Sequence, residues 1–220
     1  MDDALLQTET MLNREEYSAN PCRASSIPYW KAIQMQIPDN MRIVHADVFS
    51  EDLLDGYIDE PYFRLKHDLI DLVVPQLPDG FAVCYASCKE YADHIGGCYS
   101  GIGISESELQ GYTQRKVYCP NLWLAICDKT TTKVVATGIA ELDREIHEGV
   151  LEWIQVSPGS RGRGLGEFLV QELLRRMKPT AYFATVSGQC NNPTSPEQLY
   201  RKCGFTGHDV WHILRRKAHD

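Results

Sequence analysis

The sequence predicts an α/β protein built on a mixed sheet with helices on both faces. Two apolar runs of strand length, 122–128 and 134–143, flank a short polar turn and are typical of an antiparallel hairpin. A third run, 150–156, is followed by an amphipathic helical pattern over 165–177 and then by a further strand over 181–187. Since a strand–helix–strand crossover usually joins parallel strands, both pairings are expected in one sheet.

The remaining elements follow from shorter patterns. We expect strands over 41–49, 81–86 and 210–214, and helices over 4–17, over 61–72 and from about Ser195. Ser195 and Gln198 fit a capping box, Pro196 suits a first helical position, and Gly204 is a natural helix stop. The Gly- and Ser-rich stretch 87–116 gives no clear element. Residues 1–40, which are interrupted by prolines, are interpreted as an extension that packs on a domain spanning 41–220.

Length and composition exclude several classes of protein. The chain has 220 residues, of which 43% are hydrophobic and 24% charged, as in ordinary globular domains. The net charge of −8 argues against a general nucleic-acid binder, because such proteins neutralise phosphates with basic residues. No run approaches the roughly 20 apolar residues of a membrane helix, and the acidic N-terminus does not resemble a signal peptide. We therefore expect a cytoplasmic protein with no nucleic-acid or membrane partner.

The eight cysteines are accordingly expected to be reduced thiols. Cys84, Cys88 and Cys98, with His94 between them, suggest a metal site, but their spacing matches no zinc pattern and no second Cys-x-x-Cys pair closes one. Free thiols are the preferred interpretation, and no metal is expected.

The most informative segment is the glycine-rich turn Val156-Ser-Pro-Gly-Ser-Arg-Gly-Arg-Gly-Leu-Gly166, which lies between a strand and a helix. Glycines let backbone N–H groups approach an anion, and the helix N-terminus and two arginines add positive charge. This pattern favours a pyrophosphate site over a tight turn with a solvated basic rim. No Lys-Ser or Lys-Thr follows, so a nucleotide P-loop is disfavoured, and the glycine spacing is not that of a Rossmann fingerprint.

The same turn resembles the acyl-CoA loop of the GNAT superfamily of N-acetyltransferases, whose signature is Q/R-x-x-G-x-G/A. Here the signature is Arg161-Gly162-Arg163-Gly164-Leu165-Gly166. A second segment, Leu199-Tyr200-Arg201-Lys202-Cys203-Gly204-Phe205, resembles the L-Y-x-K-x-G-F ending of the family's last core helix, and Asn191 and Asn192 precede it. The resemblance is strong over 120–214 and thin before that.

The resemblance implies a central, mostly antiparallel sheet in which one parallel pair of strands splays apart to admit pantetheine. Backbone groups of Ile154, Gln155 and Val156 would then pair with pantetheine, and Asn192 would touch the same arm. The loop from Arg161 to Gly166 would hold the pyrophosphate of acetyl-CoA, the co-substrate.

For catalysis, the resemblance assigns Tyr200 as the acid that protonates the departing thiolate; a buried core tyrosine is the alternative. A base must also take a proton from the amine, whose pKa is ordinarily about 10. We expect Glu152, because alternation places it on one strand face with Val150, Ile154 and Val156, where apolar neighbours would desolvate it. Glu141 and Asp143 on the neighbouring strand are the next candidates. A covalent route through Cys190 or Cys203 is disfavoured, since neither has a histidine at an informative spacing.

The resemblance thus implies an N-acetyltransferase that moves acetyl from acetyl-CoA to a primary amine by direct attack. The alternative is a catalytically silent acyl-CoA sensor on the same fold. Small-molecule amines and peptide amines both stay open as acceptors, although the acidic residues Glu141, Asp143, Glu145, Glu148 and Glu152 could draw a cationic one. A homodimer through an exposed last strand is also open.

Overall fold

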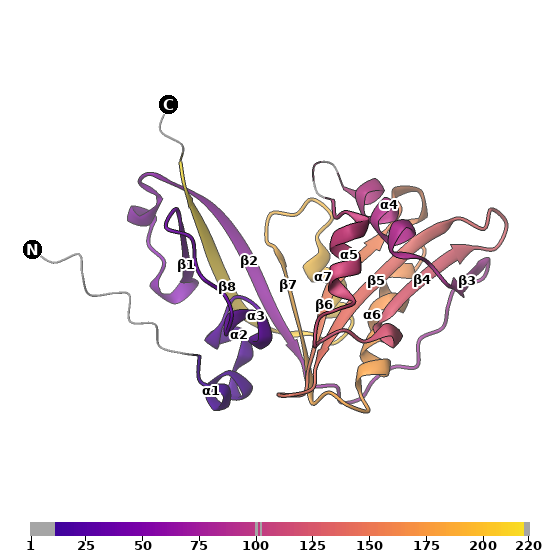
Figure 1. Ribbon diagram of the computed structural model, residues 1–220, viewed down its shortest axis with the longest axis horizontal. Helices are drawn as coiled ribbons and strands as arrows, with labels where there is room; N and C mark the ends of the chain where they lie inside the picture. Colours follow the sequence, from indigo (N-terminus) through magenta and orange to yellow (C-terminus); the bar gives the residue numbers. More distant parts are fainter. Residues whose placement is uncertain (1–11, 100, 102, 218–220) are drawn as a thin grey trace, which may run out of the picture.

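The computed structural model describes residues 12–99, 101 and 103–217, and one sheet organises this part of the chain (Figure 1). Its strand order is β1-β8-β2-β7-β6-β5-β4-β3. All neighbouring strands pair antiparallel except β6 and β7, which run parallel. The strands are β1 (Met41–His45), β2 (Tyr57–His67), β3 (Phe81–Cys84), β4 (Trp123–Asp128), β5 (Val134–Asp143), β6 (Glu148–Val156), β7 (Phe183–Gln189) and β8 (Thr206–Arg216).

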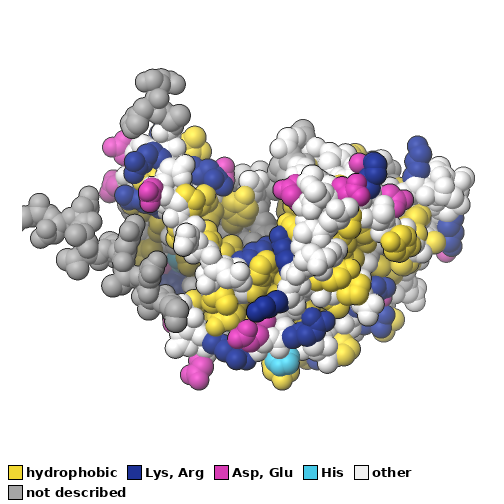
Figure 2. All heavy atoms as spheres, viewed as in Figure 1, with side chains coloured by type: hydrophobic (Ala, Val, Ile, Leu, Met, Phe, Trp, Pro, Cys, Tyr) yellow, Lys and Arg dark blue, Asp and Glu magenta, His cyan; other side chains and the backbone are white. Residues whose placement is uncertain are grey.

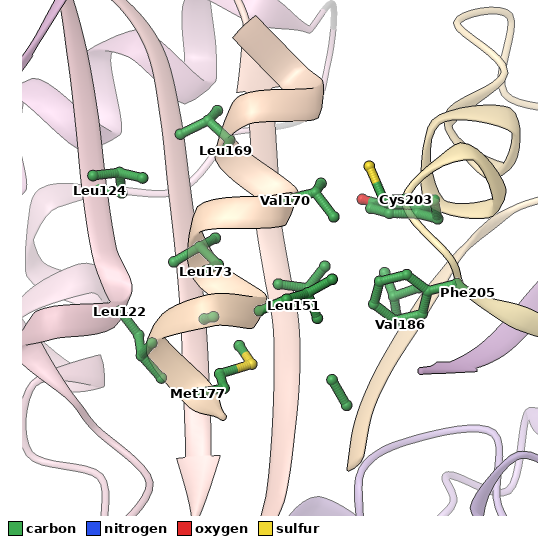
Figure 3. Close-up of a cluster of buried hydrophobic side chains, with 14 of the residues drawn as sticks. Leu122, Leu124, Leu151, Leu169, Val170, Leu173, Met177, Val186, Cys203 and Phe205 are labelled. Carbon is green, nitrogen blue, oxygen red and sulfur yellow. The ribbon is translucent and has the colours of Figure 1, made fainter. Parts of the chain in front are cut away.

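Helices cover both faces of this sheet, as expected. The long helix α6 (Leu165–Met177) packs Leu169, Leu173 and Met177 against β4, β5 and β6, and α7 (Pro196–Lys202) lies beside it (Figure 3). On the opposite face α4 (Cys88–Cys98) and α5 (Glu106–Tyr112) bury Ile95 and Leu109 against β4 and β5. The N-terminal helices are α1 (Arg14–Ala19), α2 (Pro21–Ala24) and α3 (Tyr29–Ala32). No helix in the described ranges has the length and apolar character needed to cross a bilayer.

The second half of the chain matches the predicted elements closely. The hairpin of β4 and β5, the crossover through α6, and α7 all lie within a few residues of the expected bounds. In the first half, the strand expected over 41–49 ends at His45, and the one expected over 81–86 ends at Cys84. Of the helix expected over 4–17, residues 4–11 lie outside the described residues, and α1 begins at Arg14.

The helix expected over 61–72 is wrong, because residues 61–67 belong to the 11-residue strand β2 and residues 68–72 are not helical. Phe63 and Leu65 are buried two residues apart, which is the spacing of a strand rather than of a helix. Pro61 is tolerated because β2 pairs with β7 only from Tyr62 onward, so the proline lies where the strand has a single neighbour, β8. Thus β2, from the N-terminal half, is inserted between β7 and β8.

Helix caps account for two further differences. In the unassigned stretch 87–116, Ser87 with Glu90 and Ser105 with Glu108 form capping boxes that begin α4 and α5. Ser195, by contrast, makes no side-chain cap, and its backbone is left-handed at φ 47° rather than extended as at the caps of α4 and α5. The capping box expected there is therefore wrong, although Pro196 and Gly204 do bound α7.

The last strand is an inner strand of the sheet over part of its length. β8 lies between β1 and β2, and the edges of the sheet are β1 and β3. β1 pairs with β8 from Trp211 to Arg215, so this part of the last strand is not an open edge. A homodimer stays a prediction.

The expectation of uniformly reduced cysteines is also wrong, because Cys84 and Cys127 form a disulfide. Antiparallel pairing of β3 with β4 sets Cys84 opposite Ala125 and Ala82 opposite Cys127, so the two cysteines are diagonal neighbours with Cα atoms 6.0 Å apart. This separation lies within the range that disulfides span. Six other cysteines are free thiols.

Candidate functional site

The glycine-rich turn lies between the end of β6 and the start of α6. Gly162 and Gly164 adopt left-handed backbone angles, φ 73° and 80°, which residues with a Cβ rarely occupy. Gly166 serves packing instead: a Cβ there would lie 3.2 Å from the side chain of Leu199 on α7. The turn is exposed from Arg161 to Gly164, and Leu165 is the first buried residue of α6.

The amides at the α6 end of this turn have no acceptor within the described part of the protein. Within the described part of the chain, the amides of residues 162–167 have no hydrogen-bond acceptor, and the first amide that donates to a carbonyl is that of Phe168, to Gly164 O at 3.0 Å. These free donors lie at the positive end of the 13-residue helix α6. Together they form a cradle for an anion.

The two arginines of the turn have structural contacts. The Arg161 guanidinium donates to the carbonyl oxygens of Val156, at 3.1 Å, and of Cys98, at 3.3 Å, and so ties the turn to the end of α4. The Arg163 guanidinium lies over the ring of Phe81, 4.4 Å from its centre. Both side chains are exposed and add positive charge beside the free amides.

Next to the turn, β6 and β7 separate. Their parallel pairing spans Glu148 to Leu151 on β6 and ends at Val186 on β7. Both strands continue beyond this point, to Val156 and Gln189, without pairing with each other (Figure 1). The splayed parallel pair is therefore present, and the edge of β6 that faces β7 is open over residues 152–156.

A β-bulge at Glu152 changes which β6 side chains share a face. Ile139 pairs with Trp153 and Ala140 with Leu151, so Glu152 has no partner on β5. Leu151, Ile154 and Val156 consequently pack toward α6, whereas Val150 and Glu152 line a pocket on the opposite face. The prediction that Glu152 shares its face with Ile154 and Val156 is wrong, because one extra residue inverts the alternation.

The residues expected along pantetheine are placed as follows. Ile154 and Val156 pack against α6, and the buried Gln155 side chain lies 3.5 Å from the Thr137 hydroxyl. The Val156 carbonyl accepts a bond from Arg161, and Ile154, two residues earlier, presents its backbone to the same edge of β6. The Asn192 side-chain oxygen accepts bonds from the backbone amide and the hydroxyl of Thr194, at 2.9 and 2.7 Å, and so orders the loop before α7.

Tyr200 lies on α7 at the open side of the splay. Its ring is buried against Phe63 and Phe205, with ring centres 6.2 and 5.8 Å away. Burial, together with the neighbouring phenol of Tyr99, raises the pKa of Tyr200 above its usual value. The phenol therefore stays protonated at neutral pH.

Two of the expected carboxylates meet on the face opposite α6. Glu152 forms an ion pair with Lys31 of α3. Glu141 is buried and accepts bonds from the Arg115 guanidinium, at 2.7 Å, and from the Trp30 indole N–H, at 3.0 Å. Burial and the nearby Glu152 raise the pKa of Glu141 to about 7.

The other acidic residues do not create an open negative surface. The Glu148 side chain is fully buried, and its Oε1 lies 3.4 Å from Nη2 of Arg64, whose side chain is 1% exposed. Hydroxyls of Thr185 and Tyr17 donate to the same Glu148 oxygen at 2.6 and 2.7 Å. Asp143 accepts a bond from the backbone of Glu145. Glu141, Glu148 and Glu152 thus each pair with a cation of the protein. Attraction of a cationic acceptor by the acidic residues stays a prediction.

A pocket of about 230 Å³ lies where these groups converge. Glu152 and Val150 of β6, Ser187 of β7 and Lys31 of α3 line it, together with Tyr62 and Arg64 of β2. It therefore spans the mouth of the splay, and Figure 2 shows the molecule hollowed between the two halves of the sheet. Lys31 was not expected here, since no local pattern links it to a residue 121 positions away.

Histidine and cysteine chemistry is not concentrated at this site. His94 is buried between the hydroxyls of Thr137, at 2.9 Å, and Ser157, at 3.0 Å, and burial lowers its pKa. Cys203 is buried, and burial raises the thiol pKa of both Cys203 and Cys190. In the described ranges no three His, Cys, Asp or Glu side chains come together in a way that could hold a metal ion.

Comparison with known proteins agrees with this geometry. Residues 120–207 match the family model of the acetyltransferase (GNAT) domain. No curated protein matches the chain. Among solved structures, a GCN5-related N-acetyltransferase from Sphaerobacter thermophilus superposes with a TM-score of 0.68 at 19% identity, over 82% of this chain and 61% of that one.

Two further structures share the fold. A GNAT-family acetyltransferase from Colwellia psychrerythraea has a TM-score of 0.54 at 18% identity and covers 80% of this chain and 64% of its own. A GCN5-related N-acetyltransferase from Kribbella flavida has a TM-score of 0.54 at 16% identity and covers 92% of this chain and 77% of its own. The chain thus spans less than two thirds of the Sphaerobacter and Colwellia structures. The free amides before α6, the parallel strands that separate beside them, and the family match over the same segment together identify residues 120–207 as a GNAT acetyltransferase domain.

Proposed function

We propose that the protein is an acyl-CoA-dependent N-acetyltransferase that moves acetyl from acetyl-CoA to a primary amine. The observation that carries the proposal is the row of unbonded amides at residues 162–167, beside the open edge of β6. These donors suit the diphosphate of coenzyme A, and the open edge offers backbone partners to its pantetheine arm. The thioester would then enter the splay from the α6 face.

In the proposed reaction the amine enters from the opposite face, through the pocket that Glu152 lines. Glu152 takes a proton from the ammonium, because an alkylammonium with a pKa of about 10 is not nucleophilic. The amine nitrogen attacks the thioester carbonyl, and the C–S bond breaks. Tyr200 donates a proton to the leaving thiolate, a role that suits a phenol kept neutral by burial. Glu141 lies behind Glu152, enclosed by Arg115 and Trp30.

Replacing the Tyr200 hydroxyl tests this assignment. Tyr200→Phe is expected to lower kcat at least tenfold while the Kd for acetyl-CoA stays within about twofold, since the hydroxyl acts on the leaving group. Tyr182→Phe is the matched control, because Tyr182 is 72% exposed and lies away from the splay. Equal kcat in Tyr200→Phe and the parent protein would remove Tyr200 from the mechanism.

The alternative function is a catalytically silent acyl-CoA-binding module on the same fold. Incubation with acetyl-CoA and a panel of amines, followed by detection of free thiol, separates the two. Thiol release with at least one amine supports the enzyme. Binding of acetyl-CoA by calorimetry with no release on any amine supports the module.

A further inference from the structure

The pocket on the acceptor face already contains a primary amine of the chain itself. The ammonium group of Lys31 pairs with the Glu152 carboxylate, and both residues line the pocket. The side chains are 28% and 14% exposed. In the other lysine ion pairs of the described residues, Lys66 is 32% exposed beside Asp68, Lys89 is 65% exposed beside Asp93, and Lys202 is 65% exposed beside Glu167. The carboxylates of these three pairs are all more exposed than Glu152.

This amine lies at the opening between β6 and β7. Glu152 is the first β6 residue beyond the last pairing with β7, so it marks the point where the splay opens. Ser187 of β7 lines the same pocket, which therefore reaches across the opening from one strand to the other. An amine in contact with Glu152 consequently lies on the far side of the gap from α6, facing the entry proposed for the thioester.

The segment that carries Lys31 is fixed by its neighbours. Three consecutive residues of α3 each bond to a different carboxylate: the Tyr29 amide to Glu148 at 3.2 Å, the Trp30 indole to Glu141, and Lys31 to Glu152. These contacts hold the amine at the pocket without a binding step. An amine held in this way reacts as part of the same molecule, which greatly raises its effective concentration.

We propose that Lys31 is an internal acetyl acceptor, so that the protein acetylates itself at this residue; this inference rests on the proposed function. Glu152 removes a proton from the Lys31 ammonium, and the free amine attacks the carbonyl carbon of acetyl-CoA. A C–N bond forms and the C–S bond breaks. The products are Nε-acetyl-Lys31 and coenzyme A, whose thiolate takes up a proton. Acetylation removes the positive charge that pairs with Glu152.

Intact-mass spectrometry and peptide mapping after incubation of the full chain with acetyl-CoA test this proposal. The expected result is the gain of one acetyl group, located on Lys31, at a rate that does not change when the protein is diluted tenfold. Lys31→Arg keeps the charge and is expected to abolish the label. Glu152→Gln is expected to slow labelling at least tenfold, and circular dichroism checks that it folds. Lys89→Arg is the matched control and is expected to label as the parent does.

Other outcomes overturn the proposal. Labelling of Lys31 no faster than that of exposed Lys89, or equal labelling in Glu152→Gln, would indicate uncatalysed chemistry. An unmodified Lys31 in a protein that binds acetyl-CoA and acetylates an external amine would overturn the internal acceptor alone. A calorimetric titration with no binding of acetyl-CoA would overturn the proposed function as well.

Discussion

Removing the charge of Glu148 should destabilise the protein far more than removing an exposed charge. Glu148 is 0% exposed and Arg64 1% exposed, and the other groups bonded to the Arg64 guanidinium are the neutral hydroxyls of Tyr17, Thr185 and Ser187. Glu148→Gln keeps the side-chain shape but leaves Arg64 as an uncompensated buried charge. Loss of one partner of such a pair costs about 3–5 kcal/mol, a large share of the roughly 5–15 kcal/mol by which domains are stable.

Urea denaturation followed by circular dichroism measures this cost, as a shift in midpoint at constant m-value. Asp93→Asn is the matched control, because its pair with Lys89 is exposed on both sides and contributes little to stability. The double replacement Arg64→Met with Glu148→Leu should recover much of the loss, since no buried charge remains. A loss below about 1 kcal/mol in Glu148→Gln would refute the reasoning, because Arg64 would then be solvated by other groups.

Three further predictions follow from single sites. Glu141 has a folded-state pKa of about 7, so it holds its proton to higher pH in the folded protein than in the unfolded chain. The free energy of unfolding should therefore fall as the pH rises from about 4.5 to 7. Glu141→Gln should flatten this slope in urea denaturation carried out at several pH values. Gly164→Ala forces a Cβ into φ 80°, a strain of about 1–2 kcal/mol that the free turn relieves by moving. Binding must then restore the strained conformation, so calorimetry should show roughly tenfold weaker binding of acetyl-CoA. Gly159→Ala, with ordinary φ and open space, should bind as the parent does. The Cys84–Cys127 disulfide joins residues 43 positions apart. Its reduction should lower the free energy of unfolding by about 4 kcal/mol, because the unfolded chain gains conformational entropy. An unchanged urea midpoint after reduction would contradict this prediction.

The sequence predicts those elements best whose conformation is set by residues close together in the chain. The turn from Arg161 to Gly166 combines left-handed glycines with the start of a helix, and the sequence indicates both by its closely spaced glycines and the amphipathic pattern that follows. The hairpin of β4 and β5 and the amphipathic α6 were predicted for the same reason. In the stretch 87–116 the signal was also present, as Ser-x-x-Glu at 87–90 and 105–108, but the glycines around it obscured the helices.

The rest depended on contacts between distant segments. β2 resembles a helix by its apolar count, and only the pairing with β7 and β8 makes it a strand. The bulge at Glu152 is set by the register against β5, so simple alternation assigned the wrong face. Lys31 reaches Glu152 across 121 residues, and Cys84 reaches Cys127 through the pairing of two strands, so neither contact has a short-range signature.

The central claim is that the free amides before α6 hold the diphosphate of coenzyme A beside the opening of the sheet. A crystal structure of the protein with coenzyme A tests it most directly. We predict diphosphate oxygens within hydrogen-bonding distance of amides in the range 162–167, with pantetheine along β6 at residues 154–155. A diphosphate bound elsewhere, with those amides facing only water, would contradict the account.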